Sequence, residues 1–457
     1  MFKKIEIWIL YLVLIFSILF AVAFGVLVRQ ELVGSTKVGW LSKTALSLAE
    51  IPMNIKVFLK EMDANLMTED RFPSLDGFNG DFNSKESYLL LSRYDGDLEE
   101  GIVELIDLTN FKVLHTWNPD IDEFNNMIDK VDEFKYLTRD ANNKRHLLYN
   151  PILLERGDLV FHAFVTPLRK IDSCSKLIFQ NKKDIFHHSI EKDIQGNIWT
   201  SSHLYPQNLP YKKVGRKIPG DGGYYDDAIV KLSSDGKILY EKSISEILID
   251  NGMESRLSMV GTSHEFQLDP IHVNDIQPVN FDGKFWKKGD LFISLGHQSM
   301  VILFRPSTEK IVWKYDKNIF HQHDINIINE NKISIFNNNR KYFYPDKDVV
   351  DGHNEVLIYN FVTNKAYPYL KDSLINEDVR TKSQGRSHIL PNGDLFIEET
   401  NFARTIYFNE DGSVRWTYVN RAENGNVYVV GWSRILYTKK DIQIINNFVE
   451  NKRACNE

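Results

Sequence analysis

The chain has 457 residues, a formal net charge of −7, 43% hydrophobic residues and 12% aromatic residues. This mild, spread-out charge disfavours a nucleic-acid partner, since proteins that bind nucleic acids concentrate basic residues on one surface. The apolar content is sufficient for a sizeable core and disfavours disorder. Cys174 and Cys455 are the only cysteines, which excludes a cysteine-built zinc site and a disulfide scaffold. A single disulfide bond between them remains possible in an oxidising compartment.

The N-terminal segment contains an uncharged apolar run, Ile7–Val28. As a helix this run would be ~33 Å long at ~1.5 Å per residue, enough to span a bilayer. Lys3 and Lys4 precede it, which predicts a cytoplasmic N-terminus and an exported remainder on the periplasmic or extracellular side. A cleaved signal peptide is the alternative, because Ala21–Ala23 (AVA) resembles a cleavage site, but the run extends beyond an ordinary signal core. We therefore expect a transmembrane anchor over 1–33.

The next segment, residues 34–80, has helical periodicity. Its apolar residues follow near-helical spacing from Trp40 to Met62, with lysines and glutamates between them. Pro52 should begin or kink a helix, because proline cannot donate the interior hydrogen bond. The pattern predicts a helical stalk or linker, and a single anchor followed by a stalk is compatible with a homodimer.

From about Tyr88 the pattern changes to short strands that repeat to the end of the chain. Each repeat has a strand, a polar turn and an aromatic-rich strand, preceded by another strand pair such as EKDIQGNIWTS. Four short strands per unit and about six units predict an all-β fold, a six-bladed β-propeller over 81–457. Val427–Tyr437 would complete the ring with the first blade. The repeated hairpins are Val103–Trp117, Leu168–Gln180, Ile229–Lys242, Val301–Tyr315, Val356–Leu370 and Thr405–Tyr418.

Histidines recur where these units begin. His188 and His323 fall at the same offset, ten positions before the strand that follows the turn, and His272 opens the corresponding part of another unit. Equivalent positions of propeller blades face one axis, so these histidines, with His187 and His321 beside them, should converge at one end of the channel. Hydrogen bonding between blades is the structural alternative. A metal site is a further alternative, but no short metal-binding motif is present, and we assign no metal ligand.

The motifs around these histidines resemble those of the bacterial arylsulfotransferase family, six-bladed periplasmic propellers that transfer sulfate between phenols without a nucleotide donor. The resemblance extends over about Tyr88 to Tyr437 and is stronger from Phe186 onward. Its motifs are FHHSIEKDIQGNIW (Phe186–Trp199), DPIHVNDIQ (Asp269–Gln277), GDLFISLGHQSMVILF (Gly289–Phe304), HQHDINIINENKISIFNNN (His321–Asn339) and RSHILPNGDLFI (Arg386–Ile397).

The resemblance implies that His323 attacks the donor sulfate and becomes sulfated, before an acceptor phenol takes the group. It implies that His272 and His188 bind sulfate or move protons. This chemistry is reasonable, since a neutral imidazole is a competent nucleophile and neighbouring donors can stabilise charge on the sulfuryl oxygens. The family's sulfate-binding arginine is replaced here by Gly296 in the segment SLGH. Glycine cannot supply the planar, bidentate recognition of an oxyanion that a guanidinium gives.

Another cation or donor would have to replace that arginine. Arg386 is our preferred substitute because it follows Gly385, which occupies the offset shared by His188 and His323. The alternatives are His297, Arg340 and Arg93. The remaining candidates for substrate binding are His187, His321 and Asn274.

Together these features predict a membrane-anchored enzyme that moves a sulfuryl group from a phenolic sulfate ester to an acceptor hydroxyl through a sulfo-histidine. Its partners would be a small aryl sulfate donor, a hydroxyl acceptor and the membrane, and it would need no cofactor. One alternative is a non-catalytic propeller that binds a ligand or partner on its channel face, which the missing arginine favours. The other is a metal-dependent hydrolase, which would contain stoichiometric metal.

Overall fold

The structure, a computed structural model, divides into two compact units, Met1–Ala64 and Asn65–Glu457. It describes residues 6–32, 39–62, 66–128, 140, 142–181, 185–204, 225–257, 269–343, 347–450 and 455.

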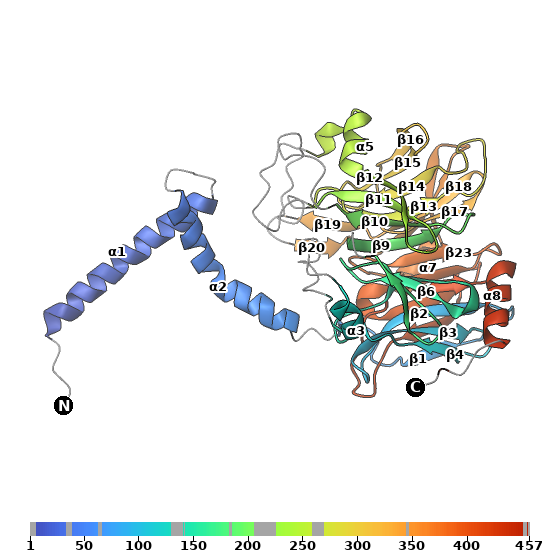
Figure 1. Ribbon diagram of the computed structural model, residues 1–457, viewed down its shortest axis with the longest axis horizontal. Coiled ribbons are helices and arrows are strands. Elements are labelled where there is room, and N and C mark those ends of the chain that lie inside the picture. Colours follow the sequence, from blue (N-terminus) through green and yellow to red (C-terminus); the bar gives the residue numbers. More distant parts are fainter. Residues whose placement is uncertain are drawn as a thin grey trace. The chain divides into compact units, whose positions relative to one another are not determined.

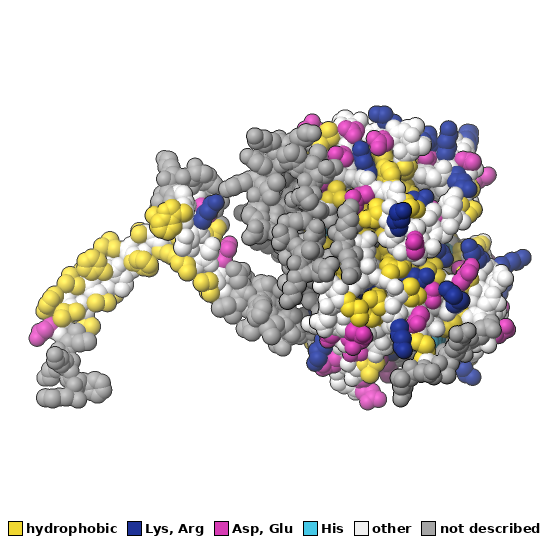
Figure 2. Space-filling view, in the orientation of Figure 1, with side chains coloured by type: hydrophobic (Ala, Val, Ile, Leu, Met, Phe, Trp, Pro, Cys, Tyr) yellow, Lys and Arg dark blue, Asp and Glu magenta, His cyan; other side chains and the backbone are white. Residues whose placement is uncertain are grey.

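The first unit consists of two helices, α1 (Ile7–Leu32) and α2 (Trp40–Met62). Hydrophobic side chains cover α1, and they are exposed (Figure 2). By length and composition, the stretch Ile7–Glu31 can cross a membrane. α2 continues through Pro52 rather than beginning there. The Ser42 hydroxyl of α2 donates a hydrogen bond of 2.6 Å to Glu31 of α1.

The second unit is the six-bladed β-propeller that the repeats predicted, an antiparallel sheet forming each blade (Figure 1). Blade 1 contains β27 (Arg434–Leu436), β2 (Tyr88–Asp95), β3 (Glu100–Asp107) and β4 (Lys112–Trp117). Blade 2 contains β5 (Tyr149–Leu153), β6 (Leu159–His162), β7 (Arg169–Ile171) and β8 (Leu177–Gln180). Blade 3 contains β9 (Ile185–Lys192), β10 (Ile198–His203), β11 (Asp227–Leu232) and β12 (Ile238–Ser243).

The other three blades follow the same order. Blade 4 contains β13 (Val273–Pro278), β14 (Leu291–Leu295), β15 (Met300–Arg305) and β16 (Lys310–Tyr315). Blade 5 contains β17 (Ile325–Asn329), β18 (Lys332–Asn337), β21 (Glu355–Asn360) and β22 (Lys365–Tyr369), and carries the hairpin β19 (Arg340–Phe343) and β20 (Lys347–Val350). Blade 6 contains β23 (Arg386–Ile389), β24 (Leu395–Glu399), β25 (Arg404–Phe408), β26 (Val414–Val419) and β1 (Gly77–Gly80).

Both ends of the propeller sequence take part in closing the ring. β27 pairs antiparallel with β2, placing Leu436 opposite Tyr88, which confirms the predicted closure by the C-terminal segment. β1 pairs with β26 as a fifth strand of blade 6. The propeller therefore begins within the segment 34–80 that the sequence assigned to the stalk. The β1 sequence, GFNG, contains no β-branched residue and gave no strand signal.

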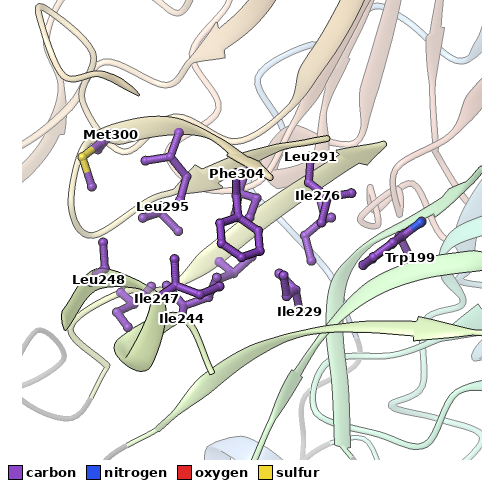
Figure 3. Close-up of a cluster of buried hydrophobic side chains, with 14 of the residues drawn as sticks. Trp199, Ile229, Ile244, Ile247, Leu248, Ile276, Leu291, Leu295, Met300 and Phe304 are labelled. Atoms are coloured by element: carbon purple, nitrogen blue, oxygen red, sulfur yellow. The ribbon is translucent and has the colours of Figure 1, made fainter. Parts of the chain in front are cut away.

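Burial follows the position of a strand within its blade. β15, in the middle of blade 4, is buried at five of its six residues because the neighbouring blades cover both of its faces. The outermost strand β16 alternates between exposed and half-buried residues. Figure 3 shows one core between blades 3 and 4, where α5 (Ile244–Asp250) directs Ile244, Ile247 and Leu248 toward the β14–β15 hairpin.

The C-terminal segment also packs on the first two blades. After β27 the chain forms α8 (Lys439–Glu450), which lies beside these blades in Figure 1. Phe448 of α8 stacks on Trp117 of β4, with 5.9 Å between ring centroids. A disulfide joins Cys455 to Cys174 in the β7–β8 turn, so the pairing that the sequence left open is present.

We expect reduction of this disulfide to lower the free energy of unfolding by about 2–4 kcal/mol, because a cross-link between distant residues restricts the unfolded chain. Urea unfolding of the detergent-solubilised protein, followed by tryptophan fluorescence, measures the change. The chain has no other cysteine, so the double variant Cys174→Ser, Cys455→Ser is the matched control. Its free energy of unfolding should equal that of the reduced wild type and should not change when the reductant is added. A double variant as stable as the oxidised protein would contradict this expectation.

Candidate active site

Histidines from three successive blades meet at the start of their first strands. His188 lies in β9, His272 directly precedes β13, and His323 lies two residues before β17. The ring centroids of His188 and His272 are 4.7 Å apart, and those of His188 and His323 are 6.2 Å apart. The first strands of these blades are neighbours around the ring, which explains why residues so distant in sequence come together.

The other three predicted histidines extend this group, which we call the histidine cluster (His187, His188, His272, His297, His321 and His323). His187 contacts His188 with 4.9 Å between ring centroids, and His297 stacks on His272 at 4.4 Å. His321 contacts His297 at 4.8 Å and lies 6.0 Å from His323. The buried Trp432 packs against His188 and His323 at 6.3 and 6.2 Å.

The backbone at this end of the blades is unusual in every blade. One non-glycine residue in the first strand of each blade, or up to four residues before that strand, has a φ between 48° and 62°, in the left-handed region. Such a conformation costs about 1–2 kcal/mol per residue and persists only where the surroundings determine it. It redirects side chains at the point where each inner strand begins. The residues, one per blade, are Trp432, Asn150, His188, His272, His321 and Gln384.

His323 is fixed in one tautomer by its neighbours. Its Nδ1 lies 2.7 Å from Asn338 Oδ1 and 3.1 Å from the His321 carbonyl, two acceptors that require the proton on Nδ1. The lone pair of Nε2 accepts a hydrogen bond of 2.8 Å from the Gln384 N–H. Burial lowers the pKa of His323 to about 3, although the Asn338 hydrogen bond opposes that change. The imidazole is therefore neutral at physiological pH.

His272 has the opposite electrostatic environment. Its Nδ1 is hydrogen-bonded to the Asp269 carboxylate, which also accepts the His272 backbone N–H at 3.0 Å. Burial disfavours the charged ring, but the charge and hydrogen bond of Asp269 outweigh it and raise the pKa of His272. Burial, followed by the charge on His272, lowers the pKa of His188 well below its ordinary value. Within the cluster, His272 is thus suited to hold and release a proton.

Arg386, the predicted substitute for the missing arginine, belongs to a different group of charges. Its guanidinium donates to Glu191 at 3.0 Å and to Asn150 at 2.8 Å, and lies 3.5 Å from Asp324. Arg434 pairs with the same Glu191 at 2.9 Å. We call Glu191, Asp324, Arg386 and Arg434 the axial ion cluster; all but Asp324 line a cavity of about 370 Å³. Arg386 neutralises buried carboxylates there.

Two alternative replacements can also be located. Arg93 is engaged in blade 1, where it pairs with Glu104 at 2.7 Å and with Asp95 at 2.9 Å. Arg340, at the start of β19, is half-buried and acts on the histidine cluster. Burial is the largest cause of the lowered pKa of His323 and of His321, and the positive charge of Arg340 lowers both further. Arg340 is therefore the better-placed cation of the arginines considered from the sequence.

Gly296 is glycine for a steric reason. A Cβ at this position would overlap the Asn274 amide nitrogen, which donates a hydrogen bond of 2.7 Å to the Gln322 carbonyl. Asn274 is fully buried, so its side chain supports the backbone beside His323. The Gly296 N–H also donates to the His272 carbonyl at 2.8 Å. With Asn274 in this position, a larger side chain does not fit at residue 296.

Sequence reasoning missed several neighbours of the cluster. Asp269 precedes His272 by three residues in the motif DPIHVNDIQ, and that spacing was a usable signal. In blade 6 the shared offset falls on Gly385, so it identified a glycine and missed Gln384, the residue directly before it. Trp432 gave no signal, because its contacts depend on ring closure.

One family model covers all of these histidines. The family model described as Arylsulfotransferase (ASST) matches residues 150–421, more than half of the chain and all of the histidine cluster. No curated protein matches the chain.

Three similar solved structures are distant in sequence. A protein of unknown function from Bacteroides caccae has 10% identity and a TM-score of 0.45, covering 76% of this chain and 98% of its own. The WD40 β-propeller domain of Doa1 has 11% identity and a TM-score of 0.38, covering 82% and 99%. A catalytically inactive virginiamycin B lyase from Staphylococcus aureus has 10% identity and a TM-score of 0.32, covering 59% and 69%.

We expect Gly296→Ala to lower the free energy of unfolding by about 1–3 kcal/mol, because the new methyl group must displace Asn274. Asn274→Ala removes that obstacle and provides the matched background. In this background Gly296→Ala should cost less, with a coupling of about 0.5–3 kcal/mol in a double-mutant cycle. Chemical denaturation of the four proteins measures the coupling. Equal costs in both backgrounds would show that the overlap does not determine the residue at this position.

Proposed function

The chain belongs to the arylsulfotransferase family, and on this basis we propose that it transfers a sulfuryl group from a phenolic sulfate ester to an acceptor hydroxyl. The observation that carries the proposal is the convergence of His188, His272 and His323 from three blades. One of these rings is neutral in a fixed tautomer and another is paired with a carboxylate. A nucleophile and a proton carrier are the two groups that the transfer requires.

In the first step, Nε2 of His323 attacks the sulfur atom of the donor. An N–S bond forms and the S–O bond to the aryl group breaks, leaving its electron pair on the phenolate oxygen. Protonated His272 gives its proton to that oxygen, so the phenol departs neutral. The Asn338 and His321 oxygens support the positive charge on the sulfated ring, because both accept from Nδ1–H.

In the second step, the acceptor hydroxyl attacks the same sulfur atom. Neutral His272 takes the proton of the hydroxyl, the N–S bond breaks, and its electron pair returns to Nε2. The sum of both steps converts an aryl sulfate and an alcohol or phenol into a phenol and a new sulfate ester, so neither a nucleotide nor a redox partner is consumed. The Asp269 carboxylate positions His272 throughout.

The hydrogen bond between Gln384 N–H and Nε2 of His323 must break before the attack. A neutral hydrogen bond of this kind contributes about 0.5–1.5 kcal/mol net, which is small beside a chemical barrier. Once it is broken, the same N–H is beside the reacting nitrogen and can donate to a sulfuryl oxygen. Gln384 therefore has two roles in the proposal, as a donor that fixes the resting tautomer and as a donor to the anion.

We assign the anion-binding cation to Arg340. Its positive charge acts on His323, His321 and His272. Arg386 belongs to the axial ion cluster, where it pairs with Glu191 and Asp324. A guanidinium is the side chain best matched to a sulfate group, since it can donate two parallel hydrogen bonds. Arg340 would take the role of the family's arginine from another strand.

We also propose that α1 anchors the protein in a membrane with its N-terminus in the cytoplasm. Lys3 and Lys4 before the apolar run support this orientation. The disulfide between Cys174 and Cys455 supports an oxidising compartment for the propeller, such as the periplasm or the cell exterior.

A second candidate function is binding of a sulfated ligand without turnover. Gly296 and the occupied lone pair of His323 favour it. Calorimetry with an aryl sulfate, alongside a turnover assay with the same compound, separates these functions. Binding of the sulfate with no release of phenol identifies a binding module.

We expect incubation with a radiolabelled phenyl sulfate to leave an acid-labile sulfate adduct on His323, because the acceptor step waits for a hydroxyl compound. Mass spectrometry of peptides prepared at neutral to alkaline pH locates the adduct. His323→Ala should remove it, and the matched control His353→Ala, a histidine outside the cluster, should retain it. An adduct that persists in His323→Ala, on His188 for example, would assign the nucleophile to another ring.

We expect Arg340→Gln to raise KM for the aryl sulfate by about 10- to 100-fold, since a charge-assisted hydrogen bond contributes about 1.5–3 kcal/mol. Arg340→Lys should recover part of the loss, and the neighbouring Lys341→Gln is the control for charge removal. Initial-rate kinetics with a chromogenic aryl sulfate measure these effects. A KM unchanged in Arg340→Gln would exclude this arginine as the anion-binding group.

A further inference from the structure

Three metal-ligating side chains lie together on one face of blade 3. His203 of β10 and Asp227 of β11 are directly opposite each other across the two strands. On the other side of β10, His187 of β9 is opposite Ser201, two residues before His203. Opposite residues and residues two apart share a face of a sheet, so all three side chains point the same way. Sequence analysis singled out only His187 of the three.

Their ligating atoms approach closely as ion pairs, but the contacts lack the alignment of hydrogen bonds. Asp227 Oδ1 lies 2.7 Å from His203 Nδ1 and 3.4 Å from His187 Nε2, and the three atoms lie within 4.8 Å of one another. All three atoms are buried, and none has a hydrogen-bond partner among the described residues. Asp227 is 0% exposed and His187 1% exposed, so bulk water does not reach these side chains. Buried polar atoms in this state are costly in free energy.

The tautomers of His187 do not resolve the problem. His187 Nδ1 and His188 Nδ1 are 2.7 Å apart, so one ring donates to the other. If His187 donates, the lone pair of its Nε2 faces the Asp227 carboxylate, and two electron-rich atoms meet in a buried space. If His188 donates, the proton on Nε2 of His187 still has no aligned acceptor. A cation between these atoms would satisfy both rings and the carboxylate.

We propose that His187, His203 and Asp227 bind a divalent first-row transition metal ion, with zinc as the form to test. Two imidazoles and one carboxylate suit such ions, and they leave at least one coordination position open. Ligand atoms ~2.0–2.2 Å from a tetrahedral ion are ~3.3 Å from one another, close to the 3.4 Å between His187 and Asp227. The 2.7 Å between His203 and Asp227 is shorter, so His203 would move away from Asp227 when the ion binds. This site does not depend on the proposed sulfuryl transfer.

The surroundings of the three side chains are those of a metal site. Asp227 Oδ2, the other carboxylate oxygen, accepts the Val273 N–H at 2.6 Å, which fixes the carboxylate and leaves Oδ1 for the ion. His187 Nδ1 can donate to His188, which fixes the tautomer with the Nε2 lone pair toward the ion. Bonds of this kind orient metal ligands. The ion would lie one histidine from His188, at the edge of the histidine cluster.

A second group of similar composition lies nearby but is already satisfied. Asp269, His272 and His297 also offer close ligating atoms. There, Asp269 accepts hydrogen bonds from the ring and the backbone of His272, and its carbonyl oxygen is hydrogen-bonded to His297. This group therefore needs no ion, and it provides an internal comparison for the experiment.

Metal analysis of the full-length detergent-solubilised protein tests the site without a turnover assay. The protein is stripped with a chelator, reloaded with Zn²⁺ and passed through a desalting column, and its metal is measured by mass spectrometry. Co²⁺ replaces Zn²⁺ in a parallel sample, where visible absorption reports coordination by nitrogen and oxygen. We expect one ion per chain and a Co²⁺ spectrum typical of four or five ligands.

Variants then locate the ion. His203→Gln and Asp227→Asn should weaken Co²⁺ binding by about tenfold or more, whereas Asp269→Asn and His353→Gln should retain it. Thermal unfolding confirms that each variant is folded. If Asp227→Asn is not folded, the result for His203→Gln alone decides whether these side chains bind the ion. If the wild-type protein holds no ion after reloading, the proposal is overturned, and the three side chains form only histidine–aspartate pairs. Loss of the ion in Asp269→Asn but not in His203→Gln also overturns it.

Discussion

Closure of the ring by β27 is the constraint on which the candidate site depends. β27 has only three residues, yet the segment around it reaches several blades. The Trp432 and Ser433 backbone N–H groups donate to Glu398 of blade 6 at 2.7 and 2.6 Å, Arg434 pairs with Glu191 of blade 3, and Trp432 packs on His188 and His323. Without closure, His188 of blade 3 and His323 beside blade 5 would lack the tryptophan that packs on them. Folding of the ring and assembly of the site are therefore one process.

Burial divides the cluster into groups with different protonation. Desolvation disfavours the charged imidazole, and it lowers the pKa of His323 to about 3 and that of His187 to about 4. His272 is buried as well, but the adjacent Asp269 reverses the direction of the shift. Environments that move similar side chains in opposite directions are how enzymes separate a nucleophile or base from an acid. One carboxylate, placed three residues before a histidine, creates this separation here.

Much of the fold was predictable because its strands and turns repeat at short intervals along the sequence. Strand–turn–strand repeats indicated the propeller, and the shared offset of His188 and His323 indicated that they converge. What local periodicity could not show depends on side-chain direction or on pairing between distant segments. Arg386 follows the residue at the expected offset and its side chain enters the axial ion cluster, whereas the charge of Arg340 acts on the histidines from a hairpin outside the repeat. The pairing of His203 with Asp227 needed the strand register across a long insertion. The strand β1 was missed because three of its four residues are glycine or asparagine, which are depleted in strands.

The disulfide has a consequence for how the ring opens and recloses. Cys455 follows the closing strand and α8, and Cys174 lies in blade 2, so an oxidised chain stays attached beyond β27. If β27 left its place beside β2, it would remain tethered at both sides and would stay at a high effective concentration near its own edge. An unpaired edge strand is also a template for another chain, and rapid intramolecular return limits the time for which that edge is available. The disulfide therefore allows the ring to open transiently while disfavouring strand exchange with other copies of the chain.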